Sequence, residues 1–331
     1  MRVLLKILLF AGVLLAALGG AAFWWVQAPI EMREPTVDFR IVPGSSLRAA
    51  AAQMREAGIA INPDLLALLA RWQGVATAIK AGSYSVTRGV TPEQLLAKLG
   101  RGDMAQGELA LIEGWTFRQW RARIDQHPDL RHETAGLAEA EIAARLGISG
   151  EPLEGWLFPD TYLFDKQSSD LELLARARRA MQKRLDAAWP ERAAGLPYRT
   201  PYEALIMASI VEKETGRGSD RPLVAAVFVN RLRLGMPLQT DPTVIYGLGE
   251  SFDGNLRKHD LQGDTPYNTY RRGGLPPTPI AMPGMASIQA ALHPADSDAL
   301  YFVARGDGSS QFSRTLDEHN KAVNKYQRGG K

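Results

Sequence analysis

Two glutamates close an apolar helical stretch in the second half of the chain. Between Tyr202 and Val211 apolar side chains lie on nearly every side, a pattern typical of a buried helix. Glu212 and Glu214 follow directly, and Gly216 is expected to end the helix. Burial and the negative end of the helix dipole both raise the pKa of a carboxyl group placed there. A carboxylic acid that stays protonated near neutral pH can act as a general acid at a glycosidic oxygen.

The two glutamates are not equivalent, because helix residues two positions apart point to nearly opposite faces. One turn back from Glu214 lie the bulky residues Met207, Ile210 and Val211. Glu212 lies above smaller side chains, so the pattern favours Glu214 as the acid. The alternative is that both carboxylates are simply solvated at an exposed helix end.

A Pro/Gly-rich stretch after this helix carries amide, hydroxyl and phenol groups that suit neutral sugar rings. The candidate groove residues are Gln239, Tyr246, Asn268 and Tyr270. Asp241 is the candidate second carboxylate, which ordinary glycoside hydrolysis would require. Alternatively, Asp241 hydrogen-bonds the amides of its own turn.

Composition and motifs exclude several other classes of protein. The chain has no cysteine, so it forms no disulfide, thiolate metal site or cysteine nucleophile. Metalloprotease, phosphate-loop and serine-hydrolase motifs are absent, and His259 and His293 lack metal-ligand spacing. We therefore expect no metal and no organic cofactor. A net charge of +3 without a basic block gives no reason to expect a nucleic-acid partner.

The N-terminus predicts a membrane anchor. Residues 7–26 carry no charge, and about twenty apolar residues match a hydrocarbon core of roughly 30 Å. Trp24 and Trp25 suit the headgroup level, and Arg2 and Lys6 favour a cytoplasmic N-terminus. A cleaved signal peptide is the alternative, but the apolar run continues past the usual length of such a peptide. We expect a single-pass protein whose remaining chain is extracytoplasmic.

The part of the chain after the anchor begins with an expected strand, two helices and a second strand. Residues 37–42 alternate like a half-buried strand, helices are expected over 47–57 and after the cap Asn62, and 82–86 returns as a strand. Residues 112–118 repeat the strand end, glycine turn, hydroxyl cap and helix start, which predicts a second small unit.

Residues 155–164 are dense in aromatic side chains around a proline turn. They predict a hairpin that either contributes to a core or offers a sugar platform. Residues 171–188 predict a charged amphipathic helix. We expect the hairpin and this helix to pack onto the last domain.

Residues 208–215, Ala-Ser-Ile-Val-Glu-Lys-Glu-Thr, resemble the catalytic-helix motif of lysozyme-like lytic transglycosylases, in an alignment that also selects Glu214. Further matches follow in order at 230–232, 238–246, 267–270, 274–280, 293–294 and 300–303. Together with Ile-Val-Pro-Gly-Ser-Ser-Leu at 41–47, they make the chain similar to the YceG-like (MltG-type) endolytic murein transglycosylases over essentially its whole length.

The resemblance implies an α+β fold with a LysM-like module followed by a mostly helical, lysozyme-like catalytic domain with short strands. It also implies cleavage of the MurNAc–GlcNAc bond within nascent glycan strands, giving 1,6-anhydro-MurNAc ends and terminating strand elongation. Glu214 would act first as acid and then as base. The implied partners are peptidoglycan glycan strands and peptidoglycan synthases at the bacterial cytoplasmic (inner) membrane, with the catalytic domain periplasmic.

The expected segments are a cytoplasmic tail (1–6), a transmembrane helix (7–26), a tether (27–36), the LysM-like module (37–105), a connecting region (106–200) and the catalytic domain (201–331). Two other functions remain open. One is a muramidase-type glycoside hydrolase that uses Glu214 and Asp241. The other is a non-catalytic peptidoglycan-binding scaffold.

Overall fold

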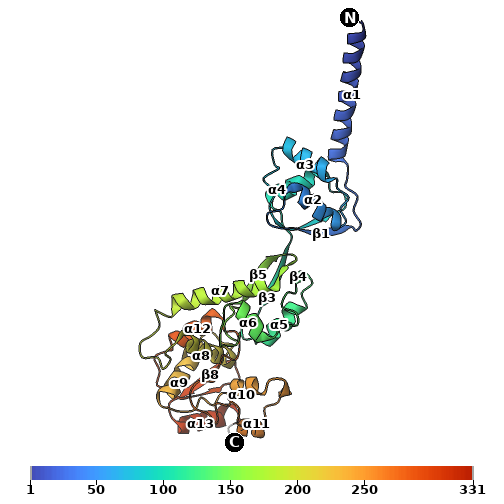
Figure 1. Cartoon of the computed structure of the whole chain (residues 1–331). Helices are drawn as coiled ribbons and strands as arrows, with labels where there is room; N and C mark the ends of the chain where they lie inside the picture. Colours follow the sequence, from blue (N-terminus) through green and yellow to red (C-terminus); the bar gives the residue numbers. More distant parts are fainter. Residues whose placement is uncertain (1, 330–331) are drawn as a thin grey trace. The chain divides into compact units, whose positions relative to one another are not determined.

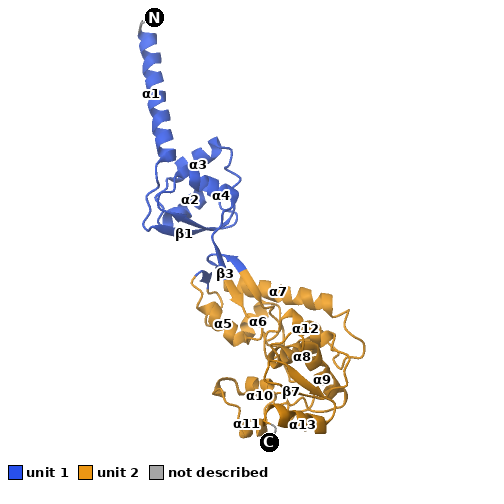
Figure 2. Cartoon of the chain, turned by 180° about the vertical axis from the view of Figure 1, so that it is seen from behind, with its two compact units in different colours: residues 1–108, 129–131, 163–168 blue, residues 109–128, 132–162, 169–331 orange. Residues whose placement is uncertain are grey.

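The computed structural model describes residues 2–329, which form helices and short two-stranded sheets (Figure 1). The chain divides into two compact units (Figure 2). Unit 1 takes the residues up to 108 together with 129–131 and 163–168. Unit 2 takes 109–128, 132–162 and the residues from 169 onward, so most of the expected connecting region belongs with the residues after 200.

Unit 1 follows the predicted order of a strand, two helices and a second strand. Its elements are α1 (Arg2–Gln27), β1 (Thr36–Ile41), α2 (Leu47–Glu56), α3 (Pro63–Trp72), β2 (Gly82–Thr87) and α4 (Pro92–Arg101). β1 pairs antiparallel with β2, and Phe39 lies opposite Tyr84 with the two rings stacked at 5.7 Å. The predicted cap is confirmed, because the Asn62 side chain accepts hydrogen bonds from the first amides of α3.

α1 is apolar and exposed, and residues Val3–Gln27 are long and apolar enough to cross a membrane. The segment after α1 was predicted to be a tether, but it packs onto unit 1. The Gln27 side-chain amide donates to Glu93 of α4 at 2.6 Å, Ile30 is buried, and Met32 forms an isolated bridge with Ile59. The apolar side chains of Ile30 and Met32 drive this packing. The prolines and charges of the segment had instead indicated a tether.

Unit 2 is mostly helical. Its helices are α5 (Phe117–Asp125), α6 (Glu139–Arg145), α7 (Asp170–Ala188), α8 (Pro201–Glu214), α9 (Arg221–Arg233), α10 (Asp241–Leu248), the 3₁₀ turn η1 (Gly249–Ser251), α11 (Lys258–Gln262), α12 (Met285–Leu292) and α13 (Leu316–Tyr326). Strands β7 (Tyr301–Ala304) and β8 (Ser310–Ser313) pair antiparallel. The boundary with unit 1 falls among β3 (Gln106–Leu111), β4 (Leu130–Arg131), β5 (Asp160–Asp165) and β6 (Ser168–Ser169), which pair as β3–β5 and β4–β6.

Two predictions for this half of the chain differ from the structure. The aromatic segment forms no hairpin of its own, because turns around Gly155, which has a positive φ, occupy the place of a first strand, and β5 pairs with β3 instead. No helix was predicted within the Pro/Gly-rich stretch, but the structure has α10, α11 and α12 there. These helices have only five to eight residues, too few for a clear periodic pattern.

α8 lies at the centre of unit 2 and contacts α9, α10 and α12. Residues 204–211 of α8 are all buried. The surrounding core includes Leu185 of α7, Phe228 of α9 and Ile288 of α12. Phe158 from the aromatic segment joins the same core, as predicted for that segment. The helix that ends at Glu214 is therefore fixed on every side by packing.

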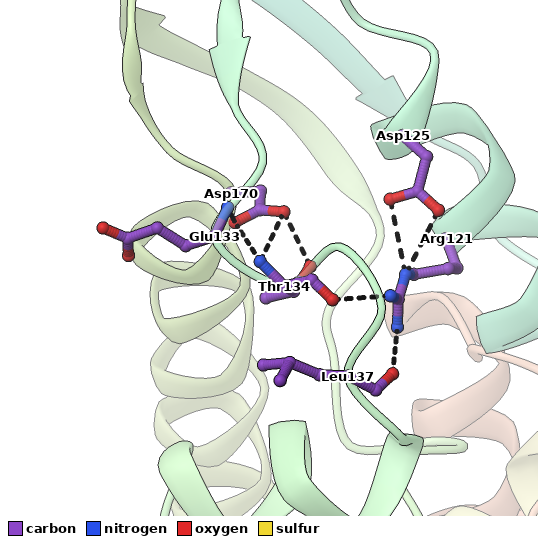
Figure 3. A network of polar contacts seen from close by, with 6 residues as sticks. All are labelled: Arg121, Asp125, Glu133, Thr134, Leu137 and Asp170. Carbon is purple, nitrogen blue, oxygen red and sulfur yellow. Dashed lines mark hydrogen bonds and ion pairs between the residues drawn. The ribbon is translucent and has the colours of Figure 1, made fainter.

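A buried carboxylate fixes the loop between β4 and α6 (Figure 3). Asp170, fully buried at the start of α7, accepts hydrogen bonds from the amides of Glu133 and Thr134 and from the Thr134 hydroxyl at 2.6 Å. Arg121 of α5 donates to the Thr134 carbonyl oxygen at 2.6 Å and pairs with Asp125. Asp170 on one side of the loop and Arg121 on the other thus satisfy hydrogen-bonding groups of the loop that packing removes from water.

Replacing Asp170 should test this arrangement. Asp170→Ala leaves two buried amides and a hydroxyl without an acceptor, so the free energy of unfolding should fall by about 3 kcal/mol. Urea unfolding of the detergent-solubilised chain measures the loss. The matched control is Asp317→Ala, an exposed aspartate in the first turn of α13, which should change stability by about 0.5 kcal/mol or less. Equal effects of the two variants would contradict the role given to Asp170.

Candidate active site

Glu214 is the last residue of α8. The helix starts at a capping box formed by Thr200 and Glu203, and the next residue after its end, Thr215, is extended. Midway, the Ser209 hydroxyl accepts a hydrogen bond from the Ile280 amide at 3.0 Å, which fixes the Pro/Gly-rich stretch along the helix. Burial of the helix body carries the carboxyl group of Glu214 to the edge of the core.

The Thr240 hydroxyl donates a hydrogen bond to the Glu214 carboxylate. Burial raises the pKa of Glu214, the hydrogen bond from Thr240 lowers it, and the nearby charge of Asp241 raises it again. The net direction is upward, because desolvation is the largest of the three effects. The predicted acid is therefore held in one orientation and in a setting that favours its protonated form.

Thr240 belongs to a cluster of three buried threonines, and hydrogen bonds within the cluster position it. Thr240, Thr243 and Thr269 are all buried, and the hydroxyls of Thr243 and Thr269 lie 2.8 Å apart. Thr243 also donates to the Thr240 carbonyl oxygen at 2.8 Å, and the Thr240 amide donates to the Thr269 hydroxyl at 3.1 Å. These three threonines were not predicted as site residues, although they lie within the motifs at 238–246 and 267–270.

Asp241 lies beside Glu214 but has its own partner. It is the first residue of α10 rather than part of an open turn, and it is exposed. The Tyr270 phenol donates to Asp241 Oδ1 at 2.6 Å, and burial raises the pKa of Tyr270, which keeps the phenol a donor. Asp241 and Tyr270, predicted from two separate motifs, thus meet beside Glu214.

Gln239 precedes the threonine cluster with a strained backbone, since its φ of 52° is unusual for a residue other than glycine. Gln239 is exposed, and its side-chain amide oxygen accepts a hydrogen bond from Arg231 at 3.3 Å. Arg231 is buried and also donates to the carbonyl oxygens of Leu238 and Leu300. Arg231, which was not predicted, therefore fixes the backbone that leads into Thr240.

The other two predicted groove residues lie differently. Asn268 is fully buried, and its amide nitrogen donates to the carbonyl oxygens of Leu261 and Gly263, so its amide fixes a loop. Tyr246 is half-buried, packs edge-on against Tyr267 at 4.9 Å, and donates from its phenol to Glu154 at 3.2 Å. The hydrogen bonds of these two side chains go to Glu154 and to the loop at 261–263 rather than to Glu214, so they hold the helix and the loop in place.

Glu212 has partners other than those of Glu214. Its carboxylate accepts a hydrogen bond from the Gly284 amide at 2.9 Å and pairs with Arg221 at 3.3 Å. Arg221 also lies 3.9 Å from Glu113, and the Glu212 side chain is almost completely buried. Glu212 thus joins α8 to the start of α12.

A second buried acid, Glu154, was not predicted. It accepts hydrogen bonds from the Phe117 amide at 3.1 Å and from the Tyr246 phenol, and so links the start of α5 to α10. The pKa of Glu154 is raised to about 8 in total. Burial is the largest cause and Glu139 also raises the pKa, while the two hydrogen bonds and Arg118 lower it. Glu154 lies one residue before the aromatic segment, where the sequence offered no sign of its burial.

One group of side chains could in principle hold a metal ion. The potential ligand atoms of Asp125, His132 and Asp170 lie within 4.8 Å of one another. Arg121 pairs with Asp125, and Asp170 already accepts hydrogen bonds from the amides and hydroxyl of the adjoining loop. An arginine paired with one of the carboxylates, and a second carboxylate already occupied by hydrogen bonds, fit a structural network better than a cation site.

The chain is similar to known proteins in sequence and in structure. A model of the YceG-like family matches residues 39–325. The endolytic murein transglycosylase of Bacillus subtilis (strain 168) is 33% identical, with 93% of this chain and 90% of that protein covered. The protein of the same name from Streptococcus pneumoniae (strain D39) is 27% identical over 86% of this chain and 57% of its own length. A crystal structure of a YceG-like protein from Listeria monocytogenes has 30% identity and a TM-score of 0.54, covering 87% of this chain and 98% of that one.

Glu154 generates a pH-dependent prediction. The fold favours protonated Glu154, because its pKa rises from 4.5 to about 8. The stability it contributes is complete below about pH 4.5 and is lost as the pH rises through 8, a total of up to about 5 kcal/mol. Glu154→Gln keeps an acceptor for Phe117 and adds a donor toward Tyr246, so it should remove this dependence.

Urea unfolding below pH 4.5 and above pH 8 measures the change in the free energy of unfolding. The parent chain should lose much more stability between the acidic and alkaline ends than Glu154→Gln does. Glu172→Gln, which changes an exposed glutamate of α7, should behave like the parent. If the free energy of unfolding of Glu154→Gln fell with pH as steeply as that of the parent chain, Glu154 would be ionised in the folded protein.

Proposed function

The chain belongs to the YceG-like family, and from this premise we propose that it is an endolytic peptidoglycan lytic transglycosylase. Its reaction is the cleavage of murein glycan strands at internal bonds. The observation that carries the proposal is the carboxyl group of Glu214, held by Thr240 at the buried end of α8 with a raised pKa. Such a group can deliver a proton at neutral pH.

We propose that Glu214 acts twice. As an acid it gives its proton to the oxygen between MurNAc and GlcNAc, while the bond from that oxygen to C1 breaks and positive charge develops at C1. As a carboxylate it then takes the proton of the MurNAc C6 hydroxyl, whose oxygen bonds to C1. The 1,6-anhydro ring closes without water, and Glu214 regains its proton.

The surroundings of Glu214 support one acid rather than two. The exposed carboxylate of Asp241 is already hydrogen-bonded to Tyr270. Its charge raises the pKa of Glu214 and so supports the protonated form of the acid. We propose that Gln239, Asp241 and Tyr270 border the groove for the sugar chain, while Tyr246 and Asn268 hold the helix and loop behind it.

We further propose that unit 1 contains a LysM-like module and that α8 with its surrounding helices forms a lysozyme-like catalytic domain. The order β1, α2, α3, β2 and the central buried helix α8 support these assignments. We also propose that α1 spans the bacterial cytoplasmic membrane with its N-terminus in the cytoplasm. Nascent glycan strands made by synthases at that membrane would then be the substrate.

Glu214→Gln should reduce strand cleavage by roughly 100- to 10,000-fold, because the amide can still accept from Thr240 but cannot transfer a proton. Release of soluble fragments from purified glycan strands measures the activity, and circular dichroism checks the fold. Glu172→Gln, on the surface of α7, should keep full activity. Full activity of Glu214→Gln would refute the assignment of the acid.

The mass of the products separates the proposed reaction from hydrolysis. A lytic transglycosylase releases anhydro ends that lack one water, and Asp241→Asn should keep the same products with activity reduced by about tenfold or less. Hydrated ends together with loss of activity in Asp241→Asn would instead indicate a muramidase-type hydrolase. Bound but uncleaved strands would indicate a scaffold.

A further inference from the structure

α3 in unit 1 is apolar on more sides than the core requires. One face packs into the core of unit 1 through Leu66, Leu69 and Ala70, all of which are buried. The other face carries Leu65, Leu68 and Trp72, whose exposed fractions are 42%, 65% and 81%. Positions i, i+3 and i+7 share one stripe along a helix, so these three side chains form a continuous row, here named the α3 stripe.

The α3 stripe is unusual for a surface in contact with water. Single exposed apolar residues are common and need no explanation, but grouped ones mark an interaction site. Trp72, which is 81% exposed, and the two exposed leucines beside it form apolar surface that the core of unit 1 does not bury. The flanking residues Asp64 and Arg71 are exposed and charged, so the apolar row has polar borders.

The stripe belongs to the unit from which α1 projects. Trp25 and Val26 near the end of α1 pack against the same core cluster that holds the buried face of α3. The hydrogen bond from Gln27 to Glu93 and the buried Ile30 leave no free linker between α1 and unit 1. Figures 1 and 2 both place α3 on the side of unit 1 from which α1 emerges.

This geometry sets the height of α3 relative to a bilayer. If α1 spans the membrane, its terminal indoles, Trp24 and Trp25, lie at the headgroup level, as amphipathic rings prefer. Since unit 1 packs directly on that end of α1, its α1-proximal side lies at the same level. An amphipathic helix with leucine and tryptophan on one face is the type of element that inserts shallowly at this depth.

We propose that the α3 stripe is a second membrane contact, in which Leu65, Leu68 and Trp72 insert among the headgroups and upper acyl chains of the bilayer that α1 spans. The inference rests on the proposed anchoring by α1 and goes beyond it. One helix alone would allow unit 1 to rotate and tilt about its attachment. Two contacts on the same unit restrict its tilt and hold a fixed side of the module toward the lipid.

Site-directed fluorescence on the full chain tests this contact, because the natural sequence has no cysteine. Leu68→Cys and Trp72→Cys are labelled with an environment-sensitive dye in nanodiscs that hold one copy each. Some of the lipids carry a nitroxide quencher near the headgroup. Both labels should emit at shorter wavelength and be quenched at least about twofold more than the control label.

The matched control is Asp103→Cys, an exposed position just beyond the far end of α4 from the Glu93 contact with α1. Leu14→Cys, within α1, reports the anchor itself. Leu14 is tested in parallel discs whose nitroxides lie in the acyl chains. If Leu14 is quenched there while Leu68 and Trp72 match Asp103, the second contact is refuted and the anchor stands. If Leu14 is not quenched, both ideas fail.

Other occupants of the stripe give different outcomes. One copy per disc removes contacts between two copies of the chain, so a signal that appears only at higher occupancy would contradict lipid insertion. Quenching of Leu68 that is abolished by soluble glycan strands would assign the stripe to sugar instead. Quenching that persists in their presence supports insertion into lipid.

Discussion

The carboxyl group of Glu214 depends on one constraint, which is the burial of the helix that ends with it. α8 is surrounded by α9, α10 and α12, so its last turn reaches the edge of the core without solvent around the body of the helix. Desolvation then outweighs the hydrogen bond from Thr240 in setting the pKa of Glu214. Much of unit 2, including the threonine cluster behind Thr240, serves to hold that single group in place.

Unit 2 contains a second acid whose burial has a different use. Glu154 shares its hydrogen bonds between a backbone amide at the start of α5 and the phenol of Tyr246 on α10. It therefore couples the small strand-helix region to the helix whose first residues contact Glu214. A neutral carboxyl group suits this position, because it joins two elements without a buried charge.

The end of α1 packs against the core of unit 1. Trp25, Val26 and Ile30 pack with the module rather than leading to it through a free linker. A rigid attachment transmits the orientation of α1 to the whole unit, whereas a flexible tether would not. The exposed row on α3 gains significance only through this attachment, since the same row at the end of a flexible linker would have no fixed height.

Sequence patterns alone determined the apolar N-terminal helix, the order of elements in unit 1 and the buried helix α8, because periodicity, caps and apolar runs are local properties. The choice of Glu214 over Glu212 as the acid stays a prediction. The aromatic hairpin and the tether were misread, and the short helix that starts at Asp241 was not predicted, since strand pairing and the packing of short segments depend on distant partners. Only the tertiary structure brought Thr240 and Tyr270 to the acid and buried Glu154 and Asn268. A pKa or a hydrogen bond across the fold depends on desolvation and distance, and both exist only once the chain has packed.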